Sequence, residues 1–195
     1  MSKKEKVNHV VVLLDETGSM ESCKEDTIGG FNNFIEEQKK SKNNIKFYLT
    51  LFNSGKIEKR YKGTDIRLVK KLSYDDYAPA NFTPLWDAIG NTIKEFNKEK
   101  KILFVIMTDG QENSSKEFNA ASIKNLIKEK EEDFNWKFIY IGMDLDNFDD
   151  AIKIGISTQA NTSKLDVIGT FSAFSNTVDC FCKTGDITFK SKKDK

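Results

Sequence analysis

Apolar and polar positions along the chain alternate between two periods. Unbroken apolar runs at 10–14 and 102–107 are typical of central parallel strands that are covered on both faces. Helical spacing of apolar residues, every three or four positions, follows most of the strand-like segments. The predicted strands are 8–14, 45–53, 55–63, 101–110, 136–144 and 156–160. The predicted helices are 25–40, 65–71, 84–98, 117–132, 147–154 and 163–182.

This alternation predicts an α/β fold, with a doubly wound and mostly parallel sheet of about six strands and helices on both faces. One strand departs from the parallel arrangement. Asn53, Ser54 and Gly55 form a turn signal between 45–53 and the highly charged segment 55–63, so we expect a hairpin whose second strand is an antiparallel edge. Gly29 and Gly30 lie within a predicted helix, where we expect them to permit close packing of that helix on the sheet.

Length and charge narrow the choice of function. The 195 residues suit one domain, which we place at 8–182 between a leader (1–7) and a lysine-rich tail (183–195). The net charge of +1 favours neither nucleic acid nor an anionic membrane as a partner, and no apolar run is long enough to span a bilayer. Three cysteines without zinc-ligand spacing are expected to be thiols, and the chain is expected to be cytoplasmic.

Polar residues with metal-binding chemistry follow the two strongest strands. Asp15, Thr17 and Ser19 come directly after the first strand, and Asp109 follows the strand that ends near Met107. Ligands of doubly wound sheets bind at the carboxyl ends of the strands, where the strand order reverses. With Thr83, which precedes a predicted helix, these residues form an all-oxygen set of the kind that Mg²⁺ or Mn²⁺ prefers.

The three pieces resemble the metal-ion-dependent adhesion site (MIDAS) of von Willebrand factor type A (VWA) domains. That site has an Asp-x-Ser-x-Ser loop, a distant Thr and a later Asp after a strand. Here "DETGSM" supplies Asp15, Thr17 and Ser19, "FTPLWDAI" supplies Thr83, and "FVIMTDGQ" supplies Asp109. Thr17 replaces the usual Ser and keeps its hydroxyl. The resemblance spans about residues 8–182 and is nearest to the intracellular VWA proteins of bacteria and phages.

The resemblance implies binding rather than catalysis. In this family the metal takes its last ligand from a Glu or Asp carboxylate of a protein partner, and the final helix can shift as the ligands change. Phe82 and Trp86 flank Thr83 and are candidates for an apolar wall against a partner, although core packing is the stronger interpretation for Trp86. Tyr77 lies in the irregular segment 73–82, which is a candidate recognition loop. The oligomeric state is not predicted.

Other interpretations of the same residues stay open. Asp15, Thr17 and Ser19 are also typical helix N-caps, and Thr83 is a candidate N-cap before Pro84. A strand-end acid also suggests a metal-dependent phosphohydrolase with Asp15 as nucleophile, although the sequence lacks the second Asp of the haloacid-dehalogenase loop. A third possibility is a scaffold whose site no longer binds metal. Glu16 and Glu112 are expected to be solvated acids outside the site.

Overall fold

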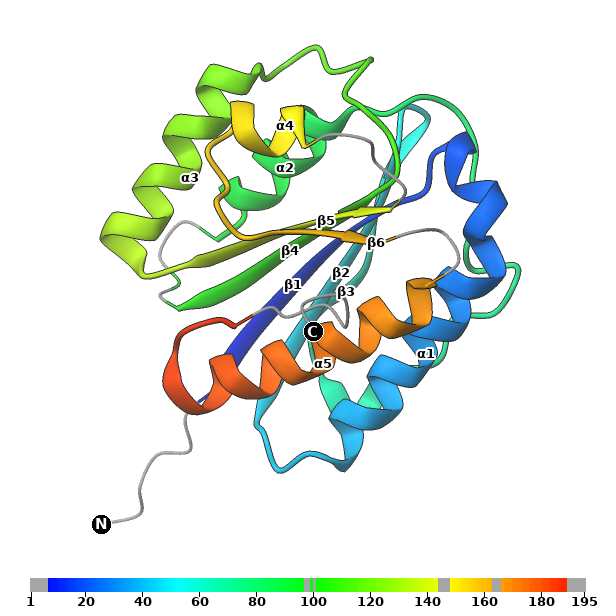
Figure 1. The fold of residues 1–195 in the computed structure, drawn as a ribbon, viewed down its shortest axis with the longest axis vertical. Coiled ribbons are helices and arrows are strands. Elements are labelled where there is room, and N and C mark those ends of the chain that lie inside the picture. The colour runs from blue at the N-terminus through cyan, green and yellow to red at the C-terminus, as the bar shows by residue number, and fades with distance from the viewer. Residues whose placement is uncertain (1–6, 97–98, 100, 144–147, 163–165, 189–195) are drawn as a thin grey trace.

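A six-stranded sheet forms the centre of the molecule in the computed structural model, which describes residues 7–96, 99, 101–143, 148–162 and 166–188 (Figure 1). The strand order is β3-β2-β1-β4-β5-β6, and only β2 and β3 pair antiparallel. The strands are β1 (Asn8–Asp15), β2 (Ile45–Asn53), β3 (Lys56–Asp65), β4 (Ile102–Thr108), β5 (Lys137–Met143) and β6 (Gln159–Thr162). The predicted fold class and the antiparallel edge strand are confirmed.

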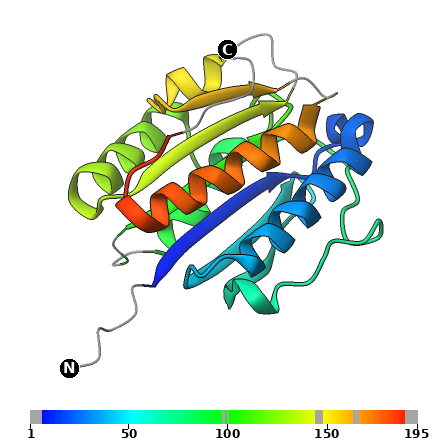
Figure 2. The same cartoon turned by 60° about the horizontal axis from the view of Figure 1, so that its bottom comes forward.

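Helices cover both faces of this sheet (Figure 2). The α-helices are α1 (Lys24–Lys40), α2 (Leu85–Lys94), α3 (Ala120–Phe134), α4 (Asp149–Lys153) and α5 (Val167–Thr184), and the 3₁₀ helices are η1 (Gly18–Cys23) and η2 (Ile66–Leu68). Side chains of α1 and α5 pack on one face, and those of α2, α3 and α4 pack on the other. The molecule therefore has three layers, with β1 and β4 in the middle of the sheet.

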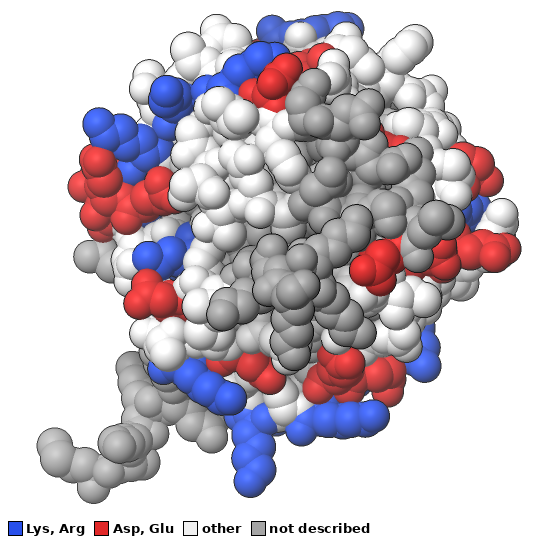
Figure 3. Space-filling model, viewed as in Figure 1, with Lys and Arg blue, Asp and Glu red and all other residues white. Residues whose placement is uncertain are grey.

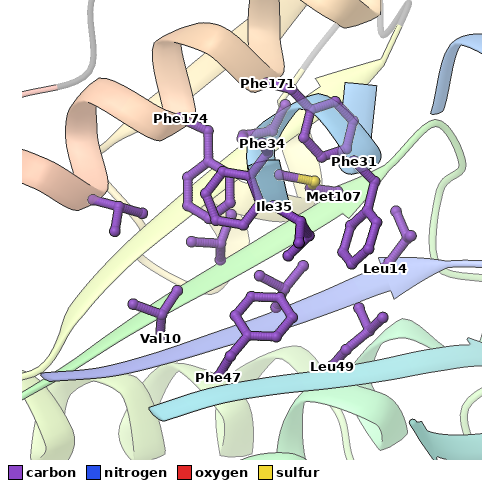
Figure 4. Close-up of a cluster of buried hydrophobic side chains, with 14 of the residues drawn as sticks. Val10, Leu14, Phe31, Phe34, Ile35, Phe47, Leu49, Met107, Phe171 and Phe174 are labelled. Atoms are coloured by element: carbon purple, nitrogen blue, oxygen red, sulfur yellow. The ribbon is translucent and has the colours of Figure 1, made fainter. Parts of the chain in front are cut away.

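The first strand shows why an unbroken apolar run is needed at this position. Val10, Val12 and Leu14 point into the core beneath α1 and α5, whereas Val11 and Leu13 point to the opposite face (Figure 4). All five are at most 1% exposed. Because successive side chains of a strand alternate between faces, the middle of a strand that is buried on both sides is apolar at every position, as at Val10–Leu14.

Helices α1 and α5 lie against each other as well as on the sheet. A Cβ added to Gly30 would stand 2.2 Å from the Phe171 ring of α5, and the rings of Phe34 and Phe174 stack at 4.4 Å. The expectation that Gly29 and Gly30 bring α1 close to the sheet is therefore wrong, because the element that α1 approaches at Gly30 is α5. Gly30 permits close contact between two helices, and Gly29 has no heavy atom of another part of the chain within 4 Å of such a Cβ.

Several predicted elements have different bounds. The helix expected at 65–71 is the single turn η2, and the one expected at 84–98 ends at Lys94. The last helix was expected at 163–182 and is seen at Val167–Thr184, while residues 163–165 lie outside the described residues. Ile168 is apolar but 52% exposed, because Val167, one position (about 100°) away around the helix, occupies the inner face.

The surface agrees with the balanced composition. Lys and Arg side chains are interspersed with Asp and Glu around the rim of the face shown in Figure 3. Among the described residues, no helix is long and apolar enough to cross a membrane. None of the three cysteines, Cys23, Cys180 and Cys182, is in a disulfide.

Candidate metal site

The candidate site lies at the carboxyl ends of β1 and β4. These strands are neighbours, but the chain builds β2 and β3 on one side of β1 before it returns to place β4 on the other side. The strand order therefore reverses between β1 and β4, where sheets of this type leave a crevice for ligands. Asp15 is the last residue of β1, and Asp109 directly follows the end of β4.

Asp15 is held rigidly and is completely buried. Its Oδ1 accepts a hydrogen bond from the Thr17 amide at 2.7 Å, and its Oδ2 accepts one from the Thr108 hydroxyl at 2.5 Å. Burial raises the pKa of Asp15 to about 7; the hydrogen bonds from Thr108 and Thr17 oppose this rise, and the nearby charge of Asp109 adds to it. A carboxylate in this position would be stabilised by a cation.

A chain of hydroxyls links the first loop to the loop after β4. The Thr17 and Ser19 hydroxyl oxygens are 3.2 Å apart, and the Ser19 hydroxyl donates to Asp109 Oδ1 at 2.6 Å. Thr17 is only 1% exposed, whereas Ser19 is exposed and Asp109 is half-buried. The cluster therefore runs from a buried carboxyl to the surface, which it reaches at Ser19.

Thr83 completes the cluster, although its position comes from a third segment. A Cβ added to Gly110 would stand 3.0 Å from Thr83 Oγ1 and 3.6 Å from Ser19 Oγ, so both hydroxyls face the same glycine. Thr83 is also tied to the loop after β4, because its amide donates to Asn113 Oδ1 at 2.8 Å and its carbonyl accepts from the Asn113 amide at 3.1 Å. The structure thus brings all five predicted site residues together.

The helix-cap interpretation fails at both segments. Thr17 occupies the N-cap position of η1 but makes no side-chain capping bond. The N-cap of α2 is Pro84 rather than Thr83, so the predicted Thr83 cap is wrong. The first amides of α2 are satisfied from another loop, because Trp86 donates to Glu112 Oε2 at 2.9 Å and Asp87 donates to Ser115 Oγ at 3.1 Å. The Thr83 hydroxyl is therefore not needed as a cap.

Two acids expected to be solvated are structural instead. Glu16 is completely buried: its Oε1 accepts from the Ala78 amide at 2.8 Å and its Oε2 lies 3.1 Å from Lys56 Nζ. Glu112 accepts from the amides of Trp86, Ser114 and Ser115 and from the Ser115 hydroxyl. Sequence reasoning missed both roles, and the only local signal was the closeness of each acid to a predicted ligand.

The three residues proposed for partner contact lie at different depths. Phe82 is 69% exposed beside Thr83, Trp86 is 7% exposed, and Tyr77 is completely buried. The Tyr77 hydroxyl donates to the backbone carbonyl of Asp15 at 2.6 Å, so its ring supports the first loop from inside. Their role in partner contact stays a prediction, and only Phe82 presents a large side chain at the surface.

The donor set fits a hard divalent cation. Asp15 and Asp109 supply carboxylate oxygens, and the hydroxyls come from Thr17, Ser19 and Thr83, with no nitrogen or sulfur among the five. Over the described residues there is no group of three or more His, Cys, Asp and Glu side chains that could hold a metal. A metal centre here would therefore depend on its hydroxyls. Gly110 leaves the space in front of two of them, which a larger residue would fill.

Solved structures of the same fold include VWA domains. The chain matches no protein-family model and no curated protein sequence. A von Willebrand factor type A structure from Catenulispora acidiphila superposes with a TM-score of 0.61 at 13% identity, over 88% of this chain and 42% of that one. Proximal thread matrix protein 1 from the mussel byssus gives 0.67 at 17% identity, over 90% and 46%. Manganese-loaded TRAP protein from Plasmodium vivax gives 0.57 at 16% identity, over 84% and 71%.

These likenesses establish the fold. The chain has a Rossmann-like VWA fold. It spans less than half the length of the mussel and Catenulispora proteins.

Proposed function

We propose that this chain is a metal-dependent protein-binding module of the MIDAS type. In this proposal Asp15, Thr17, Ser19, Thr83 and Asp109 hold Mg²⁺ or Mn²⁺, directly or through water. The observation that carries the proposal is the convergence of the Ser19 and Thr83 hydroxyls on Gly110, next to the buried carboxyl of Asp15 and the carboxyl of Asp109.

The hydroxyl-rich donor set explains why a metal ion held here would bind a carboxylate of a partner protein. A bound divalent cation would supply a positive centre that can accept one further oxygen ligand. Neutral hydroxyls from Thr17, Ser19 and Thr83 leave more of that charge uncompensated than a cage of carboxylates would. Ser19 is exposed, so the last ligand can come from outside the chain. A Glu or Asp carboxylate of a partner protein has the charge and the oxygen chemistry to fill it.

The geometry argues against the phosphohydrolase alternative. A nucleophilic Asp15 would have to reach a phosphorus atom, but it is completely buried and both of its carboxyl oxygens accept hydrogen bonds. We therefore propose a non-enzymatic role. Phosphate release by the purified chain in Mg²⁺ would support the alternative. We further propose a cytoplasmic location, supported by three cysteines that form no disulfide, one of which, Cys180, is half-buried.

Affinity capture with a matched pair of variants tests this function. The immobilised full chain is incubated with extract of the native cells in Mg²⁺ or in EDTA. Ser19→Ala removes an exposed site hydroxyl, and Ser172→Ala removes an exposed serine on α5, away from the site. We expect specific partners in Mg²⁺ with the wild type and with Ser172→Ala, and their loss in EDTA or with Ser19→Ala. Identical partner sets under all of these conditions would contradict the metal bridge.

A further inference from the structure

A cavity of about 470 Å³ adjoins the candidate metal site. It lies between the turn that joins β2 to β3, the segment just before α2, and the loop that precedes α3. Phe82 and Pro84 line it on either side of Thr83 in the sequence. A ligand held at the metal site would therefore pass next to this cavity.

Phe82 forms an exposed but anchored wall of the cavity. Its side chain is 69% exposed. Its backbone is fixed by two hydrogen bonds to Ser54, one from the Phe82 amide to Ser54 Oγ at 3.1 Å and one from the Ser54 amide to the Phe82 carbonyl at 2.9 Å. An aromatic ring that is both exposed and held in place loses little conformational entropy when a partner covers it.

The charges around the cavity are balanced. Lys56 and Lys116 line it together with Asp87 and Glu117. Lys56 pairs with Glu16 and Glu58, and the Asp87 carboxylate accepts three backbone amide bonds, from residues 116–118. The cavity therefore offers no excess charge to attract an ionised side chain, and an uncharged one is favoured.

The lining is mixed in polarity. Phe82, Pro84 and Ile57 supply apolar surface, which suits an aromatic ring. Ser114 also lines the cavity, and its hydroxyl is buried without a hydrogen-bond partner among the described residues. A buried polar group of this kind gains free energy when a ligand supplies a partner. An aromatic side chain with a hydroxyl tip combines both features, and tyrosine is the residue that has them.

We propose that the cavity binds a tyrosine of the partner, two residues away from the acid that ligates the metal. Alternate side chains of an extended strand point the same way and are about 7 Å apart. Thr83 of the metal site is next in sequence to Phe82, which borders the cavity, so one short extended segment can reach both. The inference rests on the proposed function, because the partner's acid sets the register of the segment.

Short synthetic peptides test the proposal. Each seven-residue peptide carries a central Glu in a background of Ala, Ser and Gly, with Tyr or Ala two positions before or after it. Binding to the full chain in Mg²⁺ and in EDTA is followed by NMR chemical-shift titration, which detects millimolar affinities. We expect Tyr on one side of the Glu to strengthen Mg²⁺-dependent binding about tenfold over Ala, equivalent to about 1.4 kcal/mol.

Two variants locate the effect. Phe82→Ala should remove the tenfold gain that the Tyr peptide has over the Ala peptide. Leu68→Ala is the control, because Leu68 is equally exposed, at 72%, and does not line the cavity. A Tyr gain that survives Phe82→Ala overturns the proposal. Equal binding of Tyr and Ala peptides, with Mg²⁺ dependence intact, also overturns it and leaves the proposed function standing. If no peptide binds and Mg²⁺ does not stabilise the chain, both proposals fail.

Discussion

The buried carboxyl of Asp15 should make the metal-free protein less stable as the pH rises. Its pKa is about 7 in the folded chain and 3.8 as an ordinary aspartate. Between these pH values the folded state binds more protons than the unfolded state. The stabilisation that the protonated Asp15 gives the folded state is therefore fully present below about pH 4 and lost above about pH 7. The difference corresponds to about 4 kcal/mol in the free energy of unfolding, of which about 3 kcal/mol falls between pH 5 and pH 8.

Asp15→Asn isolates this effect. The oxygen of the introduced amide can still accept from the Thr17 amide, and its NH₂ group can donate to Thr108 Oγ1, which already lies 3.2 Å from the carbonyl oxygen of Gly110 and can donate there instead. The variant has no charge to bury at this position. In EDTA at pH 8 we expect the variant to be more stable than the wild type. The difference in free energy of unfolding, variant minus wild type, should rise by up to about 3 kcal/mol between pH 5 and pH 8.

Urea unfolding followed by tryptophan fluorescence measures both proteins at pH 5, 6, 7 and 8. In EDTA the two stability curves should diverge with rising pH. Addition of Mg²⁺ at pH 8 should stabilise the wild type and leave Asp15→Asn unchanged, because the cation needs the ionised carboxylate. Parallel pH profiles in EDTA would refute the reasoning about Asp15, and equal stabilisation of both proteins by Mg²⁺ would refute its role at the metal.

Three further substitutions test other parts of the account. Gly110→Ala places a Cβ 3.0 Å from Thr83 Oγ1, so calorimetric titration should show Mg²⁺ binding at least tenfold weaker than in the wild type. The free energy of unfolding without metal should change by less than about 1 kcal/mol, and an unaltered Mg²⁺ affinity would argue against a site at this glycine. Glu112→Ala leaves the amides of Trp86, Ser114 and Ser115 without their acceptor and should cost roughly 2–3 kcal/mol in urea unfolding, whereas a loss below about 0.5 kcal/mol would show that water replaces the carboxylate. Gly30→Ala should cost about 2 kcal/mol through its clash with Phe171, and less in a Phe171→Ala background; strictly additive costs would contradict the contact.

The sheet was the most predictable part of the fold. Strands β1 and β4 are buried on both faces, and their unbroken apolar runs predict this burial. The helix ends were less predictable because they depend on partners distant in the sequence. The amides at the start of α2 are capped by Glu112 and Ser115 rather than by the neighbouring Thr83, and no local pattern contains that information.

The site residues were predictable because strand ends and a known motif indicate them, but their supports were not. Glu16 looked like an exposed acid in a polar loop. It is buried because Ala78 and Lys56, 62 and 40 residues away in the sequence, meet it in three dimensions. The position of Tyr77 was unpredictable for a similar reason, since an irregular loop with polar residues gives no sign that one ring turns inward beneath Asp15.

A crystal of the chain soaked in Mn²⁺ and examined by anomalous scattering tests the central claim most directly. We predict one strong peak among Asp15, Ser19, Thr83 and Asp109, with oxygen atoms as its only ligands. The same soak of Gly110→Ala crystals should show a much weaker peak. No peak at this site in the wild type, or a Mn²⁺ ion held by Cys23 or His9 instead, would contradict the account.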